Sequence, residues 1–277
     1  MEIQTLKKTN SFFQFIINGV SPAIVNALRR TMLAEVPTLA IDEVIIIENT
    51  SPLYDEIIAH RLGLIPLRTD LETYLLPEVC ACGGEGCQSC EVSLTLQKKA
   101  DTDATIVFSS DLQSYDPAVV PIEPNIPILK LAKGQTILVE AIARLGKGKN
   151  HAKWQPVSTV AYKYKPQVKV DNETCTLCGT CVDVCPKKIF EITPESTFVI
   201  RNELDCTLCT ICATGESACP VDAITISYTE DEFIFTIEGT GSLDVDDIVR
   251  EAIKTIREKT KEAERKIESL EDDDDDL

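Results

Sequence analysis

CTLCGTCVDVCP, residues 175–186, is the stretch that decides how this chain is organised, because a close copy, CTLCTICATGESACP, follows at residues 206–220. Each copy carries four cysteines and ends in a Cys-Pro pair. Self-similarity at a short period indicates that one structural unit has been duplicated. The segment from about residue 170 to 225 is therefore predicted to be a small unit built from two cysteine-rich halves.

The cysteine spacing of the first copy is the one that bacterial ferredoxins use to bind iron–sulfur clusters. Three thiolates in C-x2-C-x2-C bind one cubane, and the cysteine before the proline crosses to the other cluster. The rule predicts two [4Fe-4S] clusters. The alternative, eight reduced cysteines with no metal, is disfavoured because a Cys-Pro pair after such a run has few other functions. The predicted ligands are Cys175, Cys178, Cys181 and Cys219 for the first cluster, and Cys206, Cys209, Cys212 and Cys185 for the second.

One spacing departs from the ferredoxin pattern. Six residues, Ala213 to Ala218, separate Cys212 from Cys219, where the pattern has three. The longer loop either returns the Cys219 thiolate to iron or leaves a labile three-iron cluster. Because both copies keep the proline that closes the turn, we favour two four-iron clusters.

A third cysteine group, Cys80, Cys82, Cys87 and Cys90, surrounds three glycines. Its short spacings suit a closed tetrahedral zinc site with four thiolate ligands and no open position for water. The alternative is a metal-free loop, since only the spacing supports zinc.

Composition limits the classes of function. The chain has 27 Lys and Arg against 45 Asp and Glu, a formal charge of −18, which disfavours extensive contact with a phosphate backbone. The acidic run at residues 271–276 is expected to be a solvated, disordered tail. All twelve cysteines fall into the three groups of four, so metal binding in a reducing compartment is expected rather than disulfides.

The remaining chemistry is sparse. No apolar stretch is long enough for a membrane span, and the N-terminus lacks the signal-peptide pattern, so a cytoplasmic protein without membrane contact is expected. Only His60 and His151 are present, with no Ser/His/Asp order and no phosphate-binding glycine loop. No catalytic residue is therefore predicted.

Amphipathic helices are predicted near both ends of the chain. A strand at 12–17 precedes a helix capped by Ser21. The sequence that follows, up to about residue 165, is rich in β-branched residues and predicts strands near 40–47, 92–96, 105–108 and 136–143. A hairpin is expected at 223–237 around Thr229 to Asp231, followed by a long helix capped by Ser242. The apolar stripes of the two helices, predicted to be partly core and partly interface, are Ile24, Leu28 and Met32, and Val245, Ile248, Val249, Ala252 and Ile256.

Three further stretches carry a resemblance to a known family. They are SPAIVNALRRTML at 21–33 with Glu35-Val36-Pro37, DEIIAHRLGLIPL at 55–67, and HAKWQP at 151–156. Together they resemble the RNA polymerase family that contains the bacterial alpha subunit, the third-largest subunit of eukaryotic polymerases and their archaeal counterpart. The resemblance implies that His60 and Trp154 have structural rather than catalytic roles. A lone histidine such as His60 is expected to be a hydrogen-bonded core group.

The resemblance implies an α+β fold with a discontinuous alpha-like dimerisation domain at residues 1–40 and 226–277. It implies a mixed β domain at 41–168, with the four-cysteine loop, and a ferredoxin-like domain at 169–225. The implied function is non-catalytic: the chain pairs with the small subunit L and, with subunits N and P, forms a platform for the large catalytic subunits of an archaeal DNA-directed RNA polymerase. The alternative is a ferredoxin-type electron-transfer protein, which the sequence outside the insert disfavours.

Overall fold

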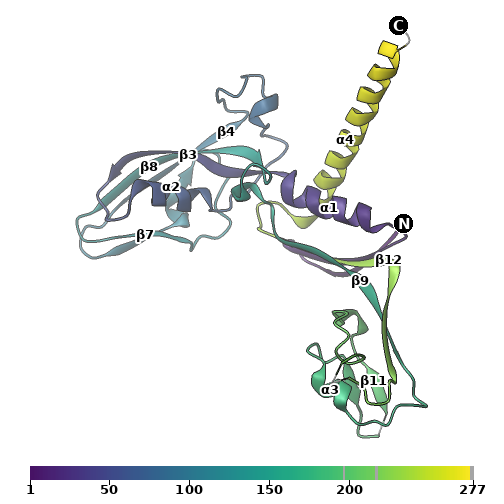
Figure 1. The fold of residues 1–277 in the computed structure, drawn as a ribbon. Helices are drawn as coiled ribbons and strands as arrows, with labels where there is room; N and C mark the ends of the chain where they lie inside the picture. Colours follow the sequence, from purple (N-terminus) through teal and green to yellow (C-terminus); the bar gives the residue numbers. More distant parts are fainter. Residues whose placement is uncertain (196, 216–217, 275–277) are drawn as a thin grey trace. The chain divides into compact units, whose positions relative to one another are not determined.

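The computed structural model describes residues 1–195, 197–215 and 218–274. It is an α+β structure that contains several antiparallel strand pairs (Figure 1). The chain divides into two compact units, and each contains segments from distant parts of the sequence. One unit holds residues 1–7, 14–25 and 161–236, and the other holds residues 8–13, 26–160 and the chain from 237 onward.

The larger unit is built on a four-stranded antiparallel sheet of order β3-β8-β4-β6. The strands are β3 (Pro37–Asn49), β8 (Thr136–Lys147), β4 (Glu91–Lys99) and β6 (Leu112–Ser114). Burial alternates along β4 and β8 because successive side chains point to opposite faces of a sheet. An antiparallel β region is therefore present as predicted, but its strands end at residue 147, and the strand that passes residue 165, β9 (Val157–Val170), belongs to the other sheet.

Helix α2 (Asp55–Gly63) covers the buried face of this sheet (Figure 1). Its residues Ile58 and Leu62 are fully buried in the same core as Leu94 and Val139. A small second sheet pairs β5 (Thr105–Phe108) with β7 (Pro127–Leu131). Short 3-10 helices occupy the connections: η1 (Pro77–Val79), η2 (Ser109–Asp111) and η3 (Ala152–Trp154).

A second four-stranded sheet joins both ends of the chain. Its order is β1-β2-β12-β9, with β1 (Glu2–Lys8), β2 (Phe12–Asn18), β9 (Val157–Val170) and β12 (Ile224–Gly239). Aromatic rings cross between its strands: the Phe15 ring stacks on Phe235 at 5.3 Å between centroids. Such stacked pairs add to the stabilisation from burial.

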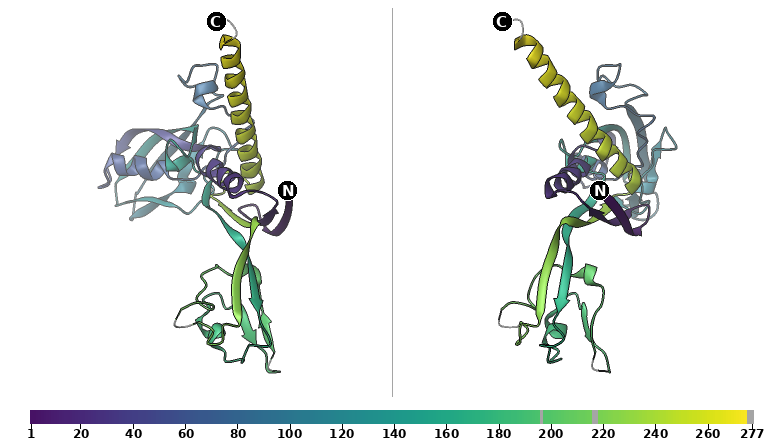
Figure 2. Two further views of the ribbon diagram at one scale, coloured as in Figure 1. Left: turned by 45° about the vertical axis from the view of Figure 1, so that its right-hand side comes forward. Right: turned by 90° about the vertical axis from the view of Figure 1, so that its right-hand side faces the viewer.

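Strands β9 and β12 run side by side into the cysteine-rich segment, as both views of Figure 2 show. That segment contains α3 (Thr180–Val184), the antiparallel pair β10 (Phe190–Ile192) and β11 (Phe198–Ile200), and η4 (Glu203–Asp205). Its small core is made of cysteines together with Ile189, Phe190 and Ile224.

The hairpin predicted at 223–237 is absent, because β12 is one continuous 16-residue strand. Thr229 accepts a hydrogen bond from Gln167 at 2.9 Å, and Glu232 forms an ion pair with Lys165 at 2.6 Å. The polar stretch therefore pairs with β9. Among Thr229, Glu230 and Asp231 only Asp231 is of a type that tight turns favour, and it continues the strand.

The two long helices begin close to the predicted positions. Helix α1 (Pro22–Ala34) has Ser21 as its N-cap, whose carbonyl accepts the amides of Ile24 and Val25. Helix α4 (Val245–Asp274) is capped by Asp244 instead of Ser242, because the Asp244 carbonyl accepts the first helical amides. Ser242 is buried and contacts the Thr240 hydroxyl.

Helix α4 continues into the acidic run as far as Asp274, so this part of the predicted tail is helical, and residues 275–277 lie outside the described residues. Among the described residues, no helix combines the length and the apolar character needed to cross a membrane.

Candidate metal centres

The four-cysteine loop brings all four predicted zinc ligands together. Cys80, Cys82, Cys87 and Cys90 follow η1 and lead into β4, and their Sγ atoms all lie within 4.8 Å of one another. The Cys80–Cys87, Cys82–Cys90 and Cys87–Cys90 sulfur distances are 3.5, 3.6 and 3.7 Å. Four sulfurs about 2.3 Å from one zinc ion at tetrahedral angles would be about 3.8 Å apart. The donor set therefore fits a tetrahedral metal ion.

Glycine makes the tight path of this loop possible. Gly83, Gly84 and Gly86 have positive φ angles of 68°, 87° and 106°, and a Cβ atom at Gly86 would clash with Oε2 of Glu91. Side chains are disfavoured at such φ values. The loop is closed by the Cys90 amide, which donates to the Cys87 carbonyl at 3.0 Å.

The four thiols are electrostatically unequal. Hydrogen bonds from the Gly86 amide, the Cys80 thiol and the Gly84 amide lower the pKa of Cys82 to about 6, whereas burial raises the pKa of Cys90 to about 12. A bound cation would remove this difference, since metal ligation holds each cysteine as a thiolate.

The internal repeat predicted from the sequence is also visible in the backbone. Residues at matching positions of the two copies share the left-handed conformation: Leu177 with Leu208, Gly179 with Thr210, and Lys188 with Asp222. Left-handed residues in series can form concave arrays of backbone amides that bind anionic groups. The positive φ angles of non-glycine residues cost energy and concentrate at functional sites.

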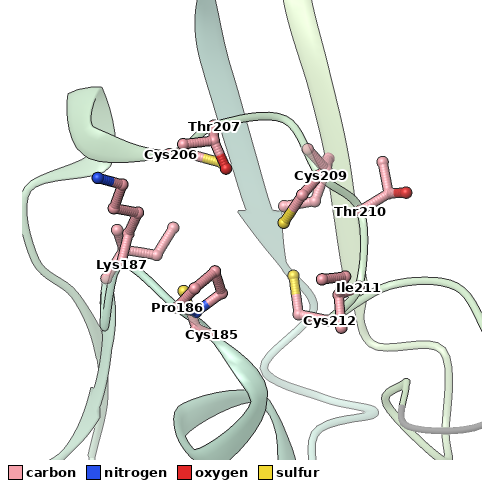
Figure 3. A pocket seen from close by; sticks show the side chains of 11 residues that line it. Cys185, Pro186, Lys187, Cys206, Thr207, Cys209, Thr210, Ile211 and Cys212 are labelled. Carbon is pink, nitrogen blue, oxygen red and sulfur yellow. The ribbon is translucent and has the colours of Figure 1, made fainter.

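Two small cavities lie in the cysteine-rich segment. Cys185, Cys206, Cys209 and Cys212 line the first, and Figure 3 shows these side chains around a common space. The second is lined by Cys175, Cys178, Cys181 and Cys219. Each cavity thus collects three cysteines of one copy and the Cys-Pro cysteine of the other. The donor chemistry fits iron–sulfur ligation, and the identity of the bound group stays a prediction.

The long loop before Cys219 does not prevent this cysteine from reaching its cavity. The Cys219 amide donates to the Cys212 carbonyl at 3.0 Å, so the two ends of the six-residue loop are held together. Cys219 is buried and lines the cavity with the three cysteines of the first copy.

Burial raises the pKa of Cys212 to about 11, whereas the Thr180 hydroxyl lowers the pKa of the exposed Cys178 thiol. Lys163 of β9 reaches into the second copy, and its Nζ atom donates to the carbonyls of Leu204 at 2.6 Å and Cys206 at 2.8 Å. Burial lowers the pKa of this lysine, against the opposing effect of Asp205.

The eight predicted interface residues fall into two sets. Half of them are buried inside this chain, as the core alternative allowed: Met32, Val245, Ile248 and Ala252. The other half keep exposed surface: Ile24, Leu28, Val249 and Ile256. Ile24 is 56% exposed, so it is the one most available to a partner.

Trp154 and His60, which the resemblance also singled out, differ in their surroundings. Trp154 Nε1 donates to the Arg144 carbonyl at 3.1 Å, and its ring lies so close to Gly146 that a Cβ atom there would clash with it. His60 is exposed on α2, contrary to the expectation of a core group, because the buried positions of this helix are Ile58 and Leu62 on another face.

Two features were not predicted. Glu35 contacts three lysines, Lys147, Lys149 and Lys259, at 3.9, 3.3 and 2.8 Å. The second is the contact of Lys163 with the second cysteine copy. Both join residues that are distant in sequence, and no local spacing signals such contacts.

Comparison with known proteins agrees with the resemblance. A family model described as the RNA polymerase Rpb3/Rpb11 dimerisation domain matches residues 14–260. The DNA-directed RNA polymerase subunit Rpo3 of Archaeoglobus fulgidus is 42% identical over 269 residues, covering 97% of this chain and 98% of that protein. Rpo3 of Methanosarcina acetivorans is 43% identical, covering 95% and 96%, and that of Pyrobaculum neutrophilum is 38% identical, covering 93% and 91%. The chain therefore belongs to the RNA polymerase Rpb3/Rpb11 dimerisation domain family.

Proposed function

We propose that this chain is a non-catalytic, cytoplasmic subunit of an archaeal DNA-directed RNA polymerase. The observation that carries the proposal is the likeness to archaeal Rpo3 proteins along nearly the whole length of both chains. The chain pairs with the small, Rpb11-like subunit L. With subunits N and P the pair forms a platform for the large catalytic subunits.

The domain division implied by the resemblance is part of this proposal. Residues 1–40 and 226–277 form the dimerisation domain, and residues 41–168 and 169–225 are two insertions. The sheet order supports the joining of the two chain ends, because β1 and β2 from the start of the chain lie beside β12 from its later part, and β9, from the end of the first insertion, extends the same sheet. The family match also spans both insertions.

Helices α1 and α4 supply the residues for pairing. Ile24 is exposed on α1, and Ile253 and Ile267 are exposed on α4. Apolar side chains exposed on an isolated subunit are typical of obligate interfaces, which are more apolar than the rest of a protein surface.

The metal centres are structural in this proposal, with a redox-regulatory role for the clusters as the second possibility. Cys175, Cys178, Cys181 and Cys219 bind one [4Fe-4S] cluster, and Cys185, Cys206, Cys209 and Cys212 bind the other. The four-cysteine loop binds one zinc ion. Bound clusters supply one-electron chemistry, whereas a four-thiolate zinc ion only holds the loop together.

Co-expression with the small subunit tests the proposal. Anaerobic size-exclusion chromatography is expected to give a heterodimer, and elemental analysis of that peak is expected to find iron, acid-labile sulfide and zinc. A soluble monomer that binds no other polymerase subunit would contradict the assembly role. Absence of iron from an anaerobic preparation would contradict the clusters alone.

A charge in the exposed stripe tests the pairing residues. Ile24→Asp places a carboxylate in the first turn of α1, where the helix dipole favours it, so the helix is expected to fold. A buried, unpaired charge at the interface is expected to weaken pairing at least about 100-fold, measured by titration of the small subunit. Ile47→Asp is the matched control, because Ile47 is 60% exposed on β3, outside the helices proposed for pairing. Equal pairing by both variants would place the interface elsewhere.

A further inference from the structure

The surroundings of the two cysteine-lined cavities differ in charge. Lys163 donates hydrogen bonds to the carbonyls of Leu204 and Cys206, and so holds its Nζ atom against the first cysteine of the second copy. Lys187 lines the same cavity (Figure 3). The cavity formed by Cys185, Cys206, Cys209 and Cys212 thus has Lys187 in its lining and Lys163 bonded to the backbone carbonyl of one of its cysteines.

No charged residue is found among the described residues that line the other cavity. Its lining residues, apart from the four cysteines, are neutral: Thr176, Leu177, Gly179, Ile192, Phe198, Val221 and Ile224. In the described parts of the chain, no lysine or arginine donates to the carbonyl of Cys175 or Glu173, the counterparts of Cys206 and Leu204. The asymmetry is therefore specific to one half of an otherwise repeated unit.

Positive charge favours the more negative of two redox states. Net charge, hydrogen bonding near the sulfurs and solvent exposure are the factors by which a protein sets a cluster's reduction potential. We infer that Lys163 makes the cluster site of Cys185, Cys206, Cys209 and Cys212 the easier of the two to reduce. This inference rests on the proposed function, because it requires that both sites bind clusters.

Lys163 contributes more than Lys187 for reasons of burial and geometry. Lys163 is partly buried and fixed by two hydrogen bonds, whereas the Lys187 side chain is exposed and screened by water. The nearby Asp205 carboxylate opposes Lys163, but Asp205 is also exposed. The summed charge of Lys163, Lys187 and Asp205 at the cluster site is therefore expected to be positive.

The redox step is a one-electron reduction. One electron passes from an external low-potential reductant, such as dithionite acting through mediators, to a [4Fe-4S]2+ cluster and gives [4Fe-4S]1+. No bond to the protein forms or breaks. The lysine ammonium keeps its proton and acts only through its charge.

The experiment is an anaerobic potentiometric titration of the purified heterodimer, followed by electron paramagnetic resonance. The native protein is expected to show two reduction steps. In Lys163→Met the higher of the two reduction potentials is expected to fall toward the lower one. The expected fall is at least about 59 mV, which for one electron is a tenfold change in the reduction equilibrium. Lys187→Met is expected to shift the same step in the same direction, but less.

Controls test whether the effect is specific to a charged donor at position 163. Lys163→Arg keeps the charge and is expected to keep the native potential. Lys165→Met removes a lysine of the same strand that is already paired with Glu232, and is expected to leave both steps in place. Iron and sulfide contents are measured for each variant.

The outcomes are distinguishable. A full iron content with an unchanged higher step in Lys163→Met, or with the lower step shifted instead, overturns the inference and leaves the proposed function intact. A protein that binds no iron overturns both the inference and the proposed clusters.

Discussion

Gly86 is the residue of the four-cysteine loop at which a side chain is least tolerable. Its φ is +106°, and an added Cβ atom would clash with the Glu91 carboxylate. That carboxylate also pairs with Arg144 at 3.0 Å, so moving it costs a second contact. Gly86→Ala is therefore expected to destabilise the loop by about 1–3 kcal/mol and to speed zinc release to a chelator at least about fivefold.

Gly83→Ala is the control for this substitution. Gly83 has a φ of +68°, within the small left-handed region open to other residues, and no atom lies within 4 Å of a Cβ atom there. Its zinc release, followed by the absorbance of a chelating dye, is expected to be slower than that of Gly86→Ala, since an alanine at position 83 carries only the left-handed backbone strain, about 1–2 kcal/mol, and meets no neighbouring atom. Equally fast release from both variants would show that close packing at Gly86 is unimportant.

At the scale of residues, the sequence predicted which cysteines would be near one another. The repeated spacings were sufficient because a tight loop leaves few arrangements for four thiolates. The left-handed angles of Leu177, Leu208 and Thr210 could not be predicted, since such residues rarely adopt them without tertiary constraint. Lys163 was missed for a related reason: its contact depends on how β9 passes the second copy.

Among the elements, α4 makes a charged contact with one mostly buried carboxylate, that of Glu35, in addition to burying Val245, Ile248 and Ala252. Glu35, directly after α1, is mostly buried and contacts Lys259 of α4 and Lys149 beyond β8 at 2.8 and 3.3 Å. Burial alone would raise the pKa of Glu35, but the hydrogen bonds from Lys259 and Lys149 dominate and lower it. A charged hydrogen bond of this kind contributes about 1–2 kcal/mol to the free energy of unfolding, and it contributes less where the lysine is exposed to water.

Glu35→Gln is expected to lower the free energy of unfolding by about 1 kcal/mol at neutral pH. Because the folded pKa of Glu35 is lowered, its contribution is fully present above the ordinary carboxyl pKa of 4.5 and is lost as the pH falls through the folded pKa. The difference between native and variant proteins is therefore expected to be constant from roughly pH 6 to 8 and to shrink below about pH 4.5. Urea unfolding at each pH measures it.

Glu262→Gln is the matched control on the same helix. Glu262 pairs with Lys266 one turn later, and both side chains are exposed. An exposed pair of this type contributes little to the free energy of unfolding, because water and salt screen it. A loss of stability in Glu262→Gln equal to that in Glu35→Gln would show that helix electrostatics, and not the contact at Glu35, holds α4.

Element prediction was right where side-chain periodicity was strong and wrong where a strand was interrupted by polar residues. The start of α1 followed from Ser21-Pro22, since a cap and a proline at the first position are local signals. Continuous β12 could not be foreseen, because the partner that makes Thr229 to Asp231 part of a strand is β9, about 60 residues earlier in the chain. Strand β1 was missed because its residues are mostly exposed and show no apolar alternation.

For the whole molecule, the sequence indicated a chain folded from discontinuous parts, and the sheet that joins β1 and β2 to β12 and β9 agrees with this. The positions at which the chain divides could not be predicted from the sequence. Strands β9 and β12 belong to the four-stranded sheet and also lead into the cysteine-rich segment, so the transition occurs inside a strand, without a linker of distinct composition.

The separate core of the cysteine-rich segment leads to a prediction about assembly. This core consists of cysteines and a few apolar residues, and it includes none of the residues in the core of the β3-β8-β4-β6 sheet. Cys178→Ser and Cys209→Ser each remove one ligand from one predicted cluster, and each variant is expected to lose about half of its iron. Pairing with the small subunit is expected to stay within about threefold of the native affinity, less than about 1 kcal/mol, because the pairing residues proposed on α1 and α4 are outside the segment.

A pull-down with the tagged small subunit, run beside iron analysis, measures both quantities on the same sample. Ile24→Asp is the control expected to do the reverse, with full iron and weak pairing. If either cysteine variant lost the heterodimer while its sheet and helices remained folded by circular dichroism, the clusters would be required for pairing. The physical route would then be β9 and β12, since these two strands are shared by the cysteine-rich segment and the sheet that contains β1 and β2.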